Sequence, residues 1–173
     1  MRTSKMRKDE RAAAPDGDVH SHMAARAGAQ ARVKSLRLEL GDWATLGDAA
    51  SRVRTAVFVR EQGIPVELEW DAADAGCLHC VAFDGERPVG TGRLLPDGHI
   101  GRMAVLPDWR RAGLGGEILE HLVAAARARG DELALLNAQC PVESFYRRHG
   151  FETVGTPFDE AGIPHVAMRR SLR

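Results

Sequence analysis

The sequence predicts one α/β domain with a mixed, mostly antiparallel sheet and helices packed against it. The chain has 173 residues, of which 44% are hydrophobic, and this is enough for one ordinary globular core. Three short apolar segments follow one another at hairpin spacing, and further strands alternate with amphipathic helices around them. These observations favour a single domain over two.

Residues 1–33 are expected to form a disordered extension, and the domain is expected to span residues 34–173. The extension is rich in Ala, Arg and Gly and has no sustained hydrophobic period. Residues 1–34 carry eight basic and four acidic side chains, although Lys+Arg and Asp+Glu both number 24 in the whole chain. The balanced total gives no reason to expect a nucleic acid or a membrane as a partner.

The composition also bears on location. No stretch approaches the roughly 20 apolar residues of a membrane helix, and the N-terminus lacks the apolar segment of a secretory signal. The three cysteines are an odd number and suit a reducing compartment. We therefore expect a cytoplasmic protein. An organelle-targeting segment is the weaker alternative, because acidic residues interrupt the start of the chain.

The first half of the domain reads as a strand, a helix and three more strands. Leu36, Leu38 and Leu40 alternate with polar residues, which indicates a strand. Residues 42–63 carry apolar side chains at helical spacing, and Gly63 and Pro65 end that helix. An antiparallel meander is expected from the strands 77–83, 88–95 and 99–106, which the turn sequences DGER and PDGH separate.

The second half adds two helices and three strands. Residues 114–130 show one apolar stripe closed by Gly130, and residues 141–150 predict a short helix with Pro141 in its first turn. The strand at residues 132–138 has too little polar alternation for a sheet edge, so we expect it to be central and covered on both faces. Two final strands are expected at residues 151–155 and 165–172.

The joint WRRAGLGG, residues 109–116, indicates an anion site between a strand and a helix. A helix begins with unpaired N–H groups and a partial positive charge, and both attract phosphate oxygens. Gly113 and Gly115, with Gly116 behind them, leave the backbone open to close approach, while Arg110 and Arg111 add fork-shaped donors. The alternative is a loop that is merely loosened by glycines. A P-loop and a dinucleotide fingerprint are both excluded by the residues at 116–118.

These residues resemble a known family. Arg110-x-x-Gly113-x-Gly115 after the strand IGRMAVLP is similar to the acetyl-coenzyme A pyrophosphate motif of the GNAT superfamily of N-acetyltransferases, and SFYRRHGFETVG is similar to its second motif. The segments RTAVFVREQGIPVELEWDAAD, HCVAF, VGTGRLL and GIPHVAMRRSL resemble the ElaA and YjcF branch. The resemblance covers roughly residues 36–172 and implies the GNAT-type acyl-coenzyme A N-acyltransferase fold. The sequence leaves the oligomeric state open, and the resemblance adds the alternative of a homodimer, as in many relatives.

The resemblance implies the cofactor contacts. Main-chain groups of Met103 and Val105 would pair with the pantetheine arm, and amides of residues 111–116 would hold the pyrophosphate. The full set implied for coenzyme A is Met103, Ala104, Val105, Arg110, Arg111, Ala112, Gly113, Leu114, Gly115, Gly116, Asn137 and Tyr146.

Acetyl transfer needs a neutral amine, donors for the developing oxyanion and a proton for the leaving thiolate. Tyr146, the single tyrosine of the chain, is the candidate donor to the thiolate, with half-buried packing as the alternative. Glu69 and His79 are the candidate bases, although an amine that arrives neutral needs none. Glu67 and His165 are candidate substrate contacts, and a merely solvated acidic loop is the alternative for part of the run from Glu67 to Asp74.

Cys77 and Cys80 in CLHC raise the question of a zinc or redox site. Neither a second cysteine pair nor a paired histidine motif accompanies them, and the pair enters a strand instead of opening a helix. We therefore expect no metal. Cys140 beside Pro141 is expected near the cofactor.

The function expected from these residues is acetyl transfer from acetyl-coenzyme A to an amine of a small molecule or protein, by direct attack in a ternary complex. One alternative is a protein of the same fold that binds acyl-coenzyme A as a sensor without transferring it. Another is an acyltransferase similar to acyl-homoserine-lactone synthases, which VFVREQ at residues 57–62 faintly resembles.

Overall fold

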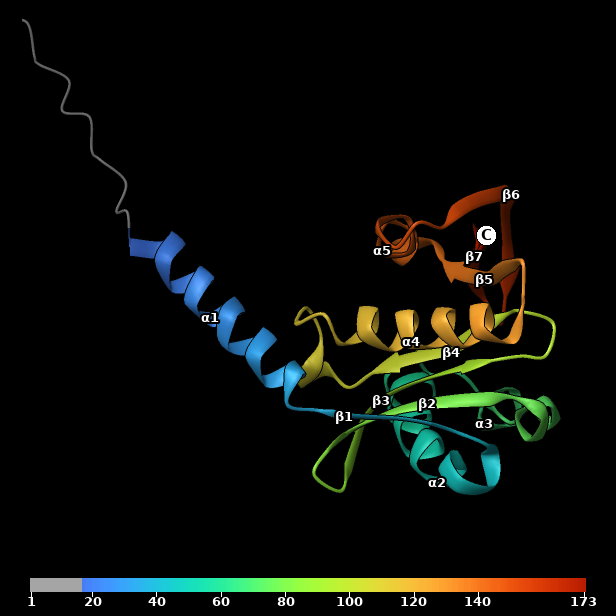
Figure 1. The fold of residues 1–173 in the computed structure, drawn as a ribbon, viewed down its shortest axis with the longest axis horizontal. Coiled ribbons are helices and arrows are strands. Elements are labelled where there is room, and N and C mark those ends of the chain that lie inside the picture. Colours follow the sequence, from blue (N-terminus) through green and yellow to red (C-terminus); the bar gives the residue numbers. More distant parts are fainter. Residues whose placement is uncertain (1–16) are drawn as a thin grey trace, which may run out of the picture.

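A computed structural model describes residues 17–173 and begins with helix α1, Gly17–Lys34, which projects from the rest of the molecule (Figure 1). Residues 17–33 are therefore helical where the sequence analysis expects a disordered extension, because alanine and arginine, which are frequent here, favour helix even without an apolar stripe. The end of α1 contacts the domain: Val33 is buried, and the Arg32 guanidinium lies 3.9 Å from the centroid of the Trp109 ring. The remainder of the expected extension, residues 1–16, lies outside the described residues.

The expected meander is confirmed as a four-stranded antiparallel sheet in the order β1-β2-β3-β4. Its strands are β1 (Arg37–Gly41), β2 (Leu78–Asp84), β3 (Arg87–Leu94) and β4 (Ile100–Val105). Alternate residues of β2 face opposite sides, so that Val81 packs with Leu46 and Ala50 of α2, whereas Cys80 belongs to the cluster around α4. The sheet is thus covered on both faces.

Helix α2, Trp43–Arg54, begins at Asp42, whose carboxylate accepts the N–H of Thr45 at 2.9 Å. It continues directly into a π-helical segment, η1 (Thr55–Glu61), where the sequence predicts one uninterrupted helix. Two short helical segments follow in the acidic run, α3 (Val66–Glu69) and η2 (Ala72–Gly76). The π segment widens the helix at the point where it reaches β4, and π segments of this kind are frequent at functional sites.

Helix α4, Leu114–Arg129, packs on the other face of the sheet and ends at Gly130, which has φ 94°. Two glycines of β3 allow the helix to lie close. A Cβ at Gly90 would meet Ile118 Cδ1 at 2.7 Å, and a Cβ at Gly92 would meet Leu122 Cδ1 at 2.9 Å. The short segment η3 (Pro107–Trp109) precedes the helix.

The second sheet is antiparallel with the order β5-β7-β6. Its strands are β5 (Leu133–Gln139), β6 (Glu152–Glu160) and β7 (Ile163–Ser171), with η4 (Cys140–Val142) and α5 (Glu143–Arg148) between β5 and β6. Buried and more exposed residues alternate along β5, and Leu133 is 41% exposed. The expectation that this strand is covered on both faces is therefore wrong: α4 covers one face, and the leucines at 133 and 135 lie on the other.

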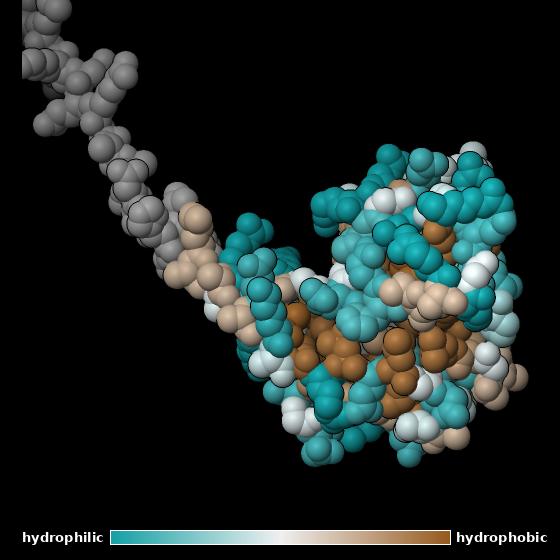
Figure 2. Space-filling view, in the orientation of Figure 1, coloured by the Kyte–Doolittle hydropathy of each residue, from teal (hydrophilic) through white to brown (hydrophobic). Residues whose placement is uncertain are grey.

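One main core joins the two sheets through α4. It contains residues from β2, β3, α4, β5, α5 and β7, among them Leu94, Ile118, Leu136, Tyr146 and Met168. Figure 2 shows hydrophobic residues gathered across the middle of the face that it draws, between hydrophilic residues above and below. Within residues 17–173, no helix has the length and hydrophobicity to cross a membrane.

Candidate active site

Strands β4 and β5 meet at one end and diverge at the other. The Leu135 N–H donates to the Gly98 carbonyl at 3.0 Å, and a parallel bridge joins His99 to Leu135. Beyond this bridge the two described strands share no ladder, and each belongs to a different sheet. We call the unpaired part of the two strands the β4–β5 split.

The free edge of β4 offers main-chain groups to this split. The Leu106 N–H donates to the Val89 carbonyl of β3 at 2.9 Å, so alternation along the strand turns the N–H and carbonyl of Val105 the other way, toward β5. The register with β3 shifts between Thr91 and Arg93, and Arg102 there has φ 50°. Met103 therefore follows a bulge beside the split, as expected for a strand that pairs with a ligand instead of a neighbouring strand.

Residues 107–116, which we call the anion loop, form a concave run of main-chain groups. Arg111 has φ 61° and Gly113 has φ 96°, and left-handed residues in such a turn make successive N–H groups converge. Gly113 provides no side-chain cap for α4, and the first ladder bond of the helix runs from the Glu117 N–H to the Gly113 carbonyl at 3.1 Å. The N–H groups of Leu114, Gly115 and Gly116 precede that bond and remain for an anion.

The three glycines of the loop have different tasks. A Cβ at Gly113 would meet nothing within 4 Å, so this glycine is needed for its positive φ. A Cβ at Gly115 would only touch Phe145 at 3.6 Å, whereas one at Gly116 would collide with His149 Cε1 at 2.9 Å. Gly116 therefore allows α5 to pack on α4, a role that the sequence analysis did not give it.

Arg110 does not point at these amides. Its Nη1 and Nη2 donate to the two carboxylate oxygens of Glu61 at 2.7 and 2.6 Å, and its Nε donates to the Val105 carbonyl at 2.8 Å. The arginine thus links the end of η1 to the edge of β4. Its expected fork on a phosphate stays a prediction that requires this pair to open, whereas Arg111 is exposed and has no such partner among residues 17–173.

Tyr146 lies on α5 against the core, with 8% of its surface exposed. Its ring makes edge contacts with Phe145 and Phe151 at centroid distances of 4.9 and 6.1 Å. Burial raises the pKa of Tyr146 to about 12, and the hydroxyl makes no hydrogen bond to any described residue. The hydroxyl is not one of the buried unpartnered atoms of residues 17–173 either, so it reaches the surface and can donate to a ligand.

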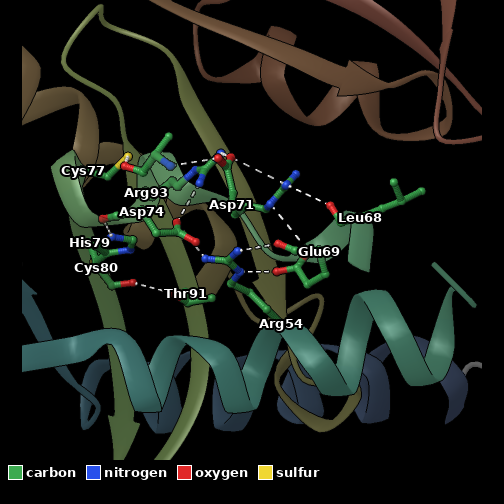
Figure 3. Close-up of polar contacts among 12 residues, drawn as sticks. Arg54, Leu68, Glu69, Asp71, Asp74, Cys77, His79, Cys80, Thr91 and Arg93 are labelled. Carbon is green, nitrogen blue, oxygen red and sulfur yellow. Dashed lines mark hydrogen bonds and ion pairs between the residues drawn. The ribbon is translucent and has the colours of Figure 1, made fainter. Parts of the chain in front are cut away.

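The candidate base Glu69 belongs to a group of charged side chains between α2, η2 and the sheet, shown in Figure 3. We call this group the charge cluster, and it consists of Arg54, Glu69, Asp71, Asp74, Arg93 and Arg102. Glu69 is 7% exposed, accepts from the Arg54 guanidinium, and lies 3.5 Å from Arg102 Nε. Both carboxylate oxygens of Glu69 thus lie beside guanidinium groups and do not face the split.

The rest of the charge cluster is also paired, although Arg93 Nε and Arg102 Nε are buried without a hydrogen-bond partner. Asp74 Oδ1 accepts from Arg54 at 2.9 Å and from Arg93 at 2.6 Å, and Asp71 Oδ2 accepts from Arg93 at 2.6 Å. Asp74, which is 3% exposed, is therefore not one of the solvated members of the acidic run. Glu67, the candidate substrate contact, is exposed on α3 and outside the cluster.

His79, the other candidate base, is 1% exposed and packs against Trp43 at a ring distance of 4.9 Å. Its Nε2 lies 2.9 Å from the Asp74 carbonyl, so this nitrogen carries the hydrogen. Burial lowers the pKa of His79 and keeps the ring neutral. The surroundings are those of a core histidine of β2, and its role as a base stays a prediction.

Asp74, Cys77 and His79 bring their ligand atoms within 4.8 Å of one another. Their chemistry does not suit a cation, because two guanidiniums already occupy one oxygen of Asp74. Burial also raises the pKa of the Cys77 thiol and that of Cys80, the latter to about 12, which disfavours the thiolate that zinc requires. The three cysteines among the described residues are free thiols.

The structure brings Asn137 and His165 to the far side of the split. Asn137 is exposed on β5, and its amide lies 3.4 Å from a carboxylate oxygen of Glu160. His165 pairs with Gln139 across β5 and β7. The Gln139 amide in turn donates to the Gln62 side chain at 3.1 Å, which joins β5 to the end of η1.

Sequence reasoning missed Gln62, Gln139 and the arginines of the charge cluster. Gln62 and Gln139 are 77 residues apart, so nothing local could pair them. The positions of Arg54 and Arg93 offered a weak signal, since a charged residue in the middle of an apolar helix face or strand is buried only with a partner.

A sheet that splits beside a helix N-terminus, with free main-chain groups on the strand edge and on the loop, is the arrangement of an acyl-coenzyme A-dependent acyltransferase. The sequence model of the acetyltransferase (GNAT) domain matches residues 48–172. The uncharacterized N-acetyltransferase YjcF of Bacillus subtilis is 42% identical over 122 residues, which are 68% of this chain and 87% of YjcF.

Two solved structures are similar. An acyl-CoA N-acyltransferase from Pseudomonas aeruginosa has a TM-score of 0.71 at 33% identity, covering 79% of this chain and 100% of that one. Escherichia coli ElaA has a TM-score of 0.71 at 26% identity, covering 79% and 99%. The chain belongs to the GNAT acetyltransferase family, and its similarity to the ElaA and YjcF branch, its fold class and acyl transfer as its class of activity are confirmed.

Proposed function

We propose that this protein is an N-acetyltransferase that transfers acetyl from acetyl-coenzyme A to a primary amine of a small molecule or a protein, by direct attack in a ternary complex. The observation that carries the proposal is the anion loop: left-handed Arg111 and Gly113 turn free amides outward at the start of α4. The loop follows the end of β4 at which the β4–β5 split is open. The cytoplasm is the proposed location, since it keeps the free cysteines reduced.

The residues present fit this cofactor. Amides of residues 111–116 would hold the pyrophosphate, and the open space at Gly113 leaves room for it. The free edge at Met103 and Val105 would pair with the pantetheine arm, once Arg110 leaves the Val105 carbonyl or shares it. When bound, acetyl-coenzyme A supplies an activated acyl group as a thioester.

The same strand edge supplies donors for charge on the acyl oxygen. The N–H of Val105 faces the split, and main-chain donors fixed in a rigid strand need no reorganisation when charge develops. This is the task that we assign to the strand beyond the bulge at Arg102.

Tyr146 would donate a hydrogen bond to the leaving sulfur. Its pKa, raised to about 12 by burial, keeps the phenol protonated at every physiological pH. Full proton transfer to a thiolate, whose ordinary pKa is about 8.5, is uphill from so weak an acid. We therefore assign Tyr146 a stabilising hydrogen bond, and the thiolate takes its proton from solvent afterwards.

The sensor alternative has one observation in its favour, which is the deep packing of Tyr146 in the core. Two measurements separate the proposals. Calorimetric titration with coenzyme A tests the anion loop, and thiol release from acetyl-coenzyme A with spermidine, glucosamine, lysine and a peptide with a free N-terminus tests transfer. Binding with turnover supports the transferase, binding without turnover on any amine supports the sensor, and no binding overturns both.

A further inference from the structure

His165 lies in the middle of the second sheet, beside the end of the β4–β5 split. It is directly opposite Gln139 on β5 and Phe158 on β6, and directly opposite residues of an antiparallel pair share one face. The His165 and Phe158 rings stack at a centroid distance of 6.2 Å and an interplanar angle of 26°. The imidazole is therefore held in place by its neighbour on the next strand.

This face is opposite to the one that α4 covers. Ala138 and Val166, the neighbours of Gln139 and His165 in sequence, are buried in the core around α4 together with Tyr146. Gln139 instead reaches Gln62 at the end of η1. Seen across the sheet, His165 is thus on the η1 side, and Tyr146 and the anion loop are on the α4 side.

The hydrogen bond of the ring fixes its tautomer. His165 Nδ1 lies 2.7 Å from the Ile163 carbonyl, and a carbonyl only accepts, so Nδ1 carries the hydrogen. In the neutral ring, Nε2 then has the lone pair. Nε2 has no partner among residues 17–173 and is not one of their buried unpartnered atoms, so it is open to a ligand. His79 has the opposite tautomer and is enclosed.

We propose that His165 is the general base that takes the proton from the acceptor amine, an inference that rests on the proposed function. In the step, the amine nitrogen forms its bond to the acyl carbon, the carbon–sulfur bond breaks, and the amine proton passes to Nε2. The sulfur leaves as a thiolate beside the Tyr146 hydroxyl and is protonated by solvent, and the imidazolium returns its proton to solvent. The Ile163 carbonyl stabilises the charged ring throughout.

The other groups facing this ring are compatible with that task. From β5 and η1 the facing side chains are Asn137, Gln139 and Gln62, which are neutral. From β6 the carboxylate of Glu160 lies on the same face, opposite Ile163. At the far end of β7, Arg169 lies opposite Glu152 of β6. A carboxylate on this face attracts a cationic amine.

The test compares His165→Gln with His121→Gln. His121 Nδ1 also bonds a carbonyl, that of Glu117, at 2.8 Å. This histidine is exposed on α4 and belongs to neither strand of the split. Rates are measured by thiol release with the four amines above, from pH 6 to 10. In His165→Gln we expect kcat/KM at neutral pH to fall about 100-fold and its rise with pH to move to the more alkaline range in which the amine itself loses its proton. The deficit should shrink at high pH, where the amine arrives neutral.

A second readout needs no turnover. Nitrogen-15 NMR of the histidine rings reports the tautomer, and the proposal expects His165 with hydrogen on Nδ1. An Nε2–H tautomer overturns it, as does a His165→Gln variant with the rate and pH profile of His121→Gln. That last result leaves the proposed function intact. If the unmutated protein does not bind coenzyme A in calorimetry, the proposed function is overturned, and this inference with it.

Discussion

The anion loop and the charge cluster are both polar, but their polar groups are paired in the cluster and unpaired in the loop. In the cluster, three arginines meet three carboxylates, and Arg54 and Asp74 are each about 97% buried. In the loop, the donors are main-chain amides without partners, and Arg110, Arg111 and Gly113 beside them are exposed. Charges that satisfy one another stabilise a fold, whereas donors left unsatisfied at the surface are available to a ligand.

The largest effect that sharpens this comparison is expected from Arg54→Met. The substitution leaves the buried Glu69 with only the 3.5 Å contact to Arg102 and the buried Asp74 with only Arg93, so we expect the free energy of unfolding to fall by about 3–5 kcal/mol. Arg110→Met breaks the more exposed pair with Glu61 and should cost less than about 1 kcal/mol. Urea denaturation of both variants measures the difference, and equal losses would contradict the distinction between the two regions.

The next effect concerns the ligand side. In Tyr146→Phe, turnover with acetyl-coenzyme A should fall by about 10- to 100-fold, because the sulfur loses its hydrogen-bond donor. Stability should stay nearly constant, since the hydroxyl has no partner in the structure described here. Steady-state kinetics and calorimetry with coenzyme A are the measurements. A collapse of coenzyme A affinity, with stability unchanged, would show that Tyr146 binds and does not assist departure of the thiol.

How much of this could be predicted from sequence differs between local and distant features. The meander and α4 were predicted because alternation, apolar stripes and turn residues act within about ten residues. The π segment at 55–61 and helix α1 were not, since no apolar pattern distinguishes them. The anion loop was predicted because its glycines and its helix start are consecutive in the chain.

The site partners were predicted least. Arg54 meets Glu69 and Asp74, which are 15 and 20 residues away, and Glu61 meets Arg110 across 49 residues. Only the packed fold brings such pairs together. The sequence alone therefore predicts Glu69 as an unpaired base and Arg110 as an unpaired phosphate ligand. For the same reason the second role of Gly116, which is to make room for His149, could not be predicted.

A smaller effect compares two glycines of the same helix. Gly113 and Gly130 have φ 96° and 94°, and a Cβ at either would meet nothing within 4 Å. Alanine should therefore destabilise the protein equally at both positions, by roughly 1–2 kcal/mol. Only Gly113→Ala should weaken coenzyme A, by about tenfold, because only there do the converging amides face the ligand. Thermal unfolding and calorimetry measure the two quantities, and equal affinities in both variants would remove the anion loop from the site.

The smallest effect is the pH dependence of the charge cluster. Burial alone would raise the pKa of Asp74, but hydrogen bonds from Arg54 and Arg93 outweigh it, and the bond from Arg93 lowers the pKa of Asp71. Each carboxylate is thus protonated more readily in the unfolded chain than in the folded one. The stability that they contribute is fully present above the ordinary aspartate pKa of about 4. It is lost as the pH falls through the lowered pKa values of the folded protein.

Urea denaturation between pH 5 and pH 2.5 measures this loss. The free energy of unfolding should decline with falling pH, and in Asp71→Asn the decline should be shallower because one of the shifted groups is gone. Asp71→Asn also leaves the better-buried Asp74 in place, so part of the slope must remain. An unchanged slope would mean that the bond from Arg93 to Asp71 does not contribute to the free energy of unfolding, although the two groups are in contact.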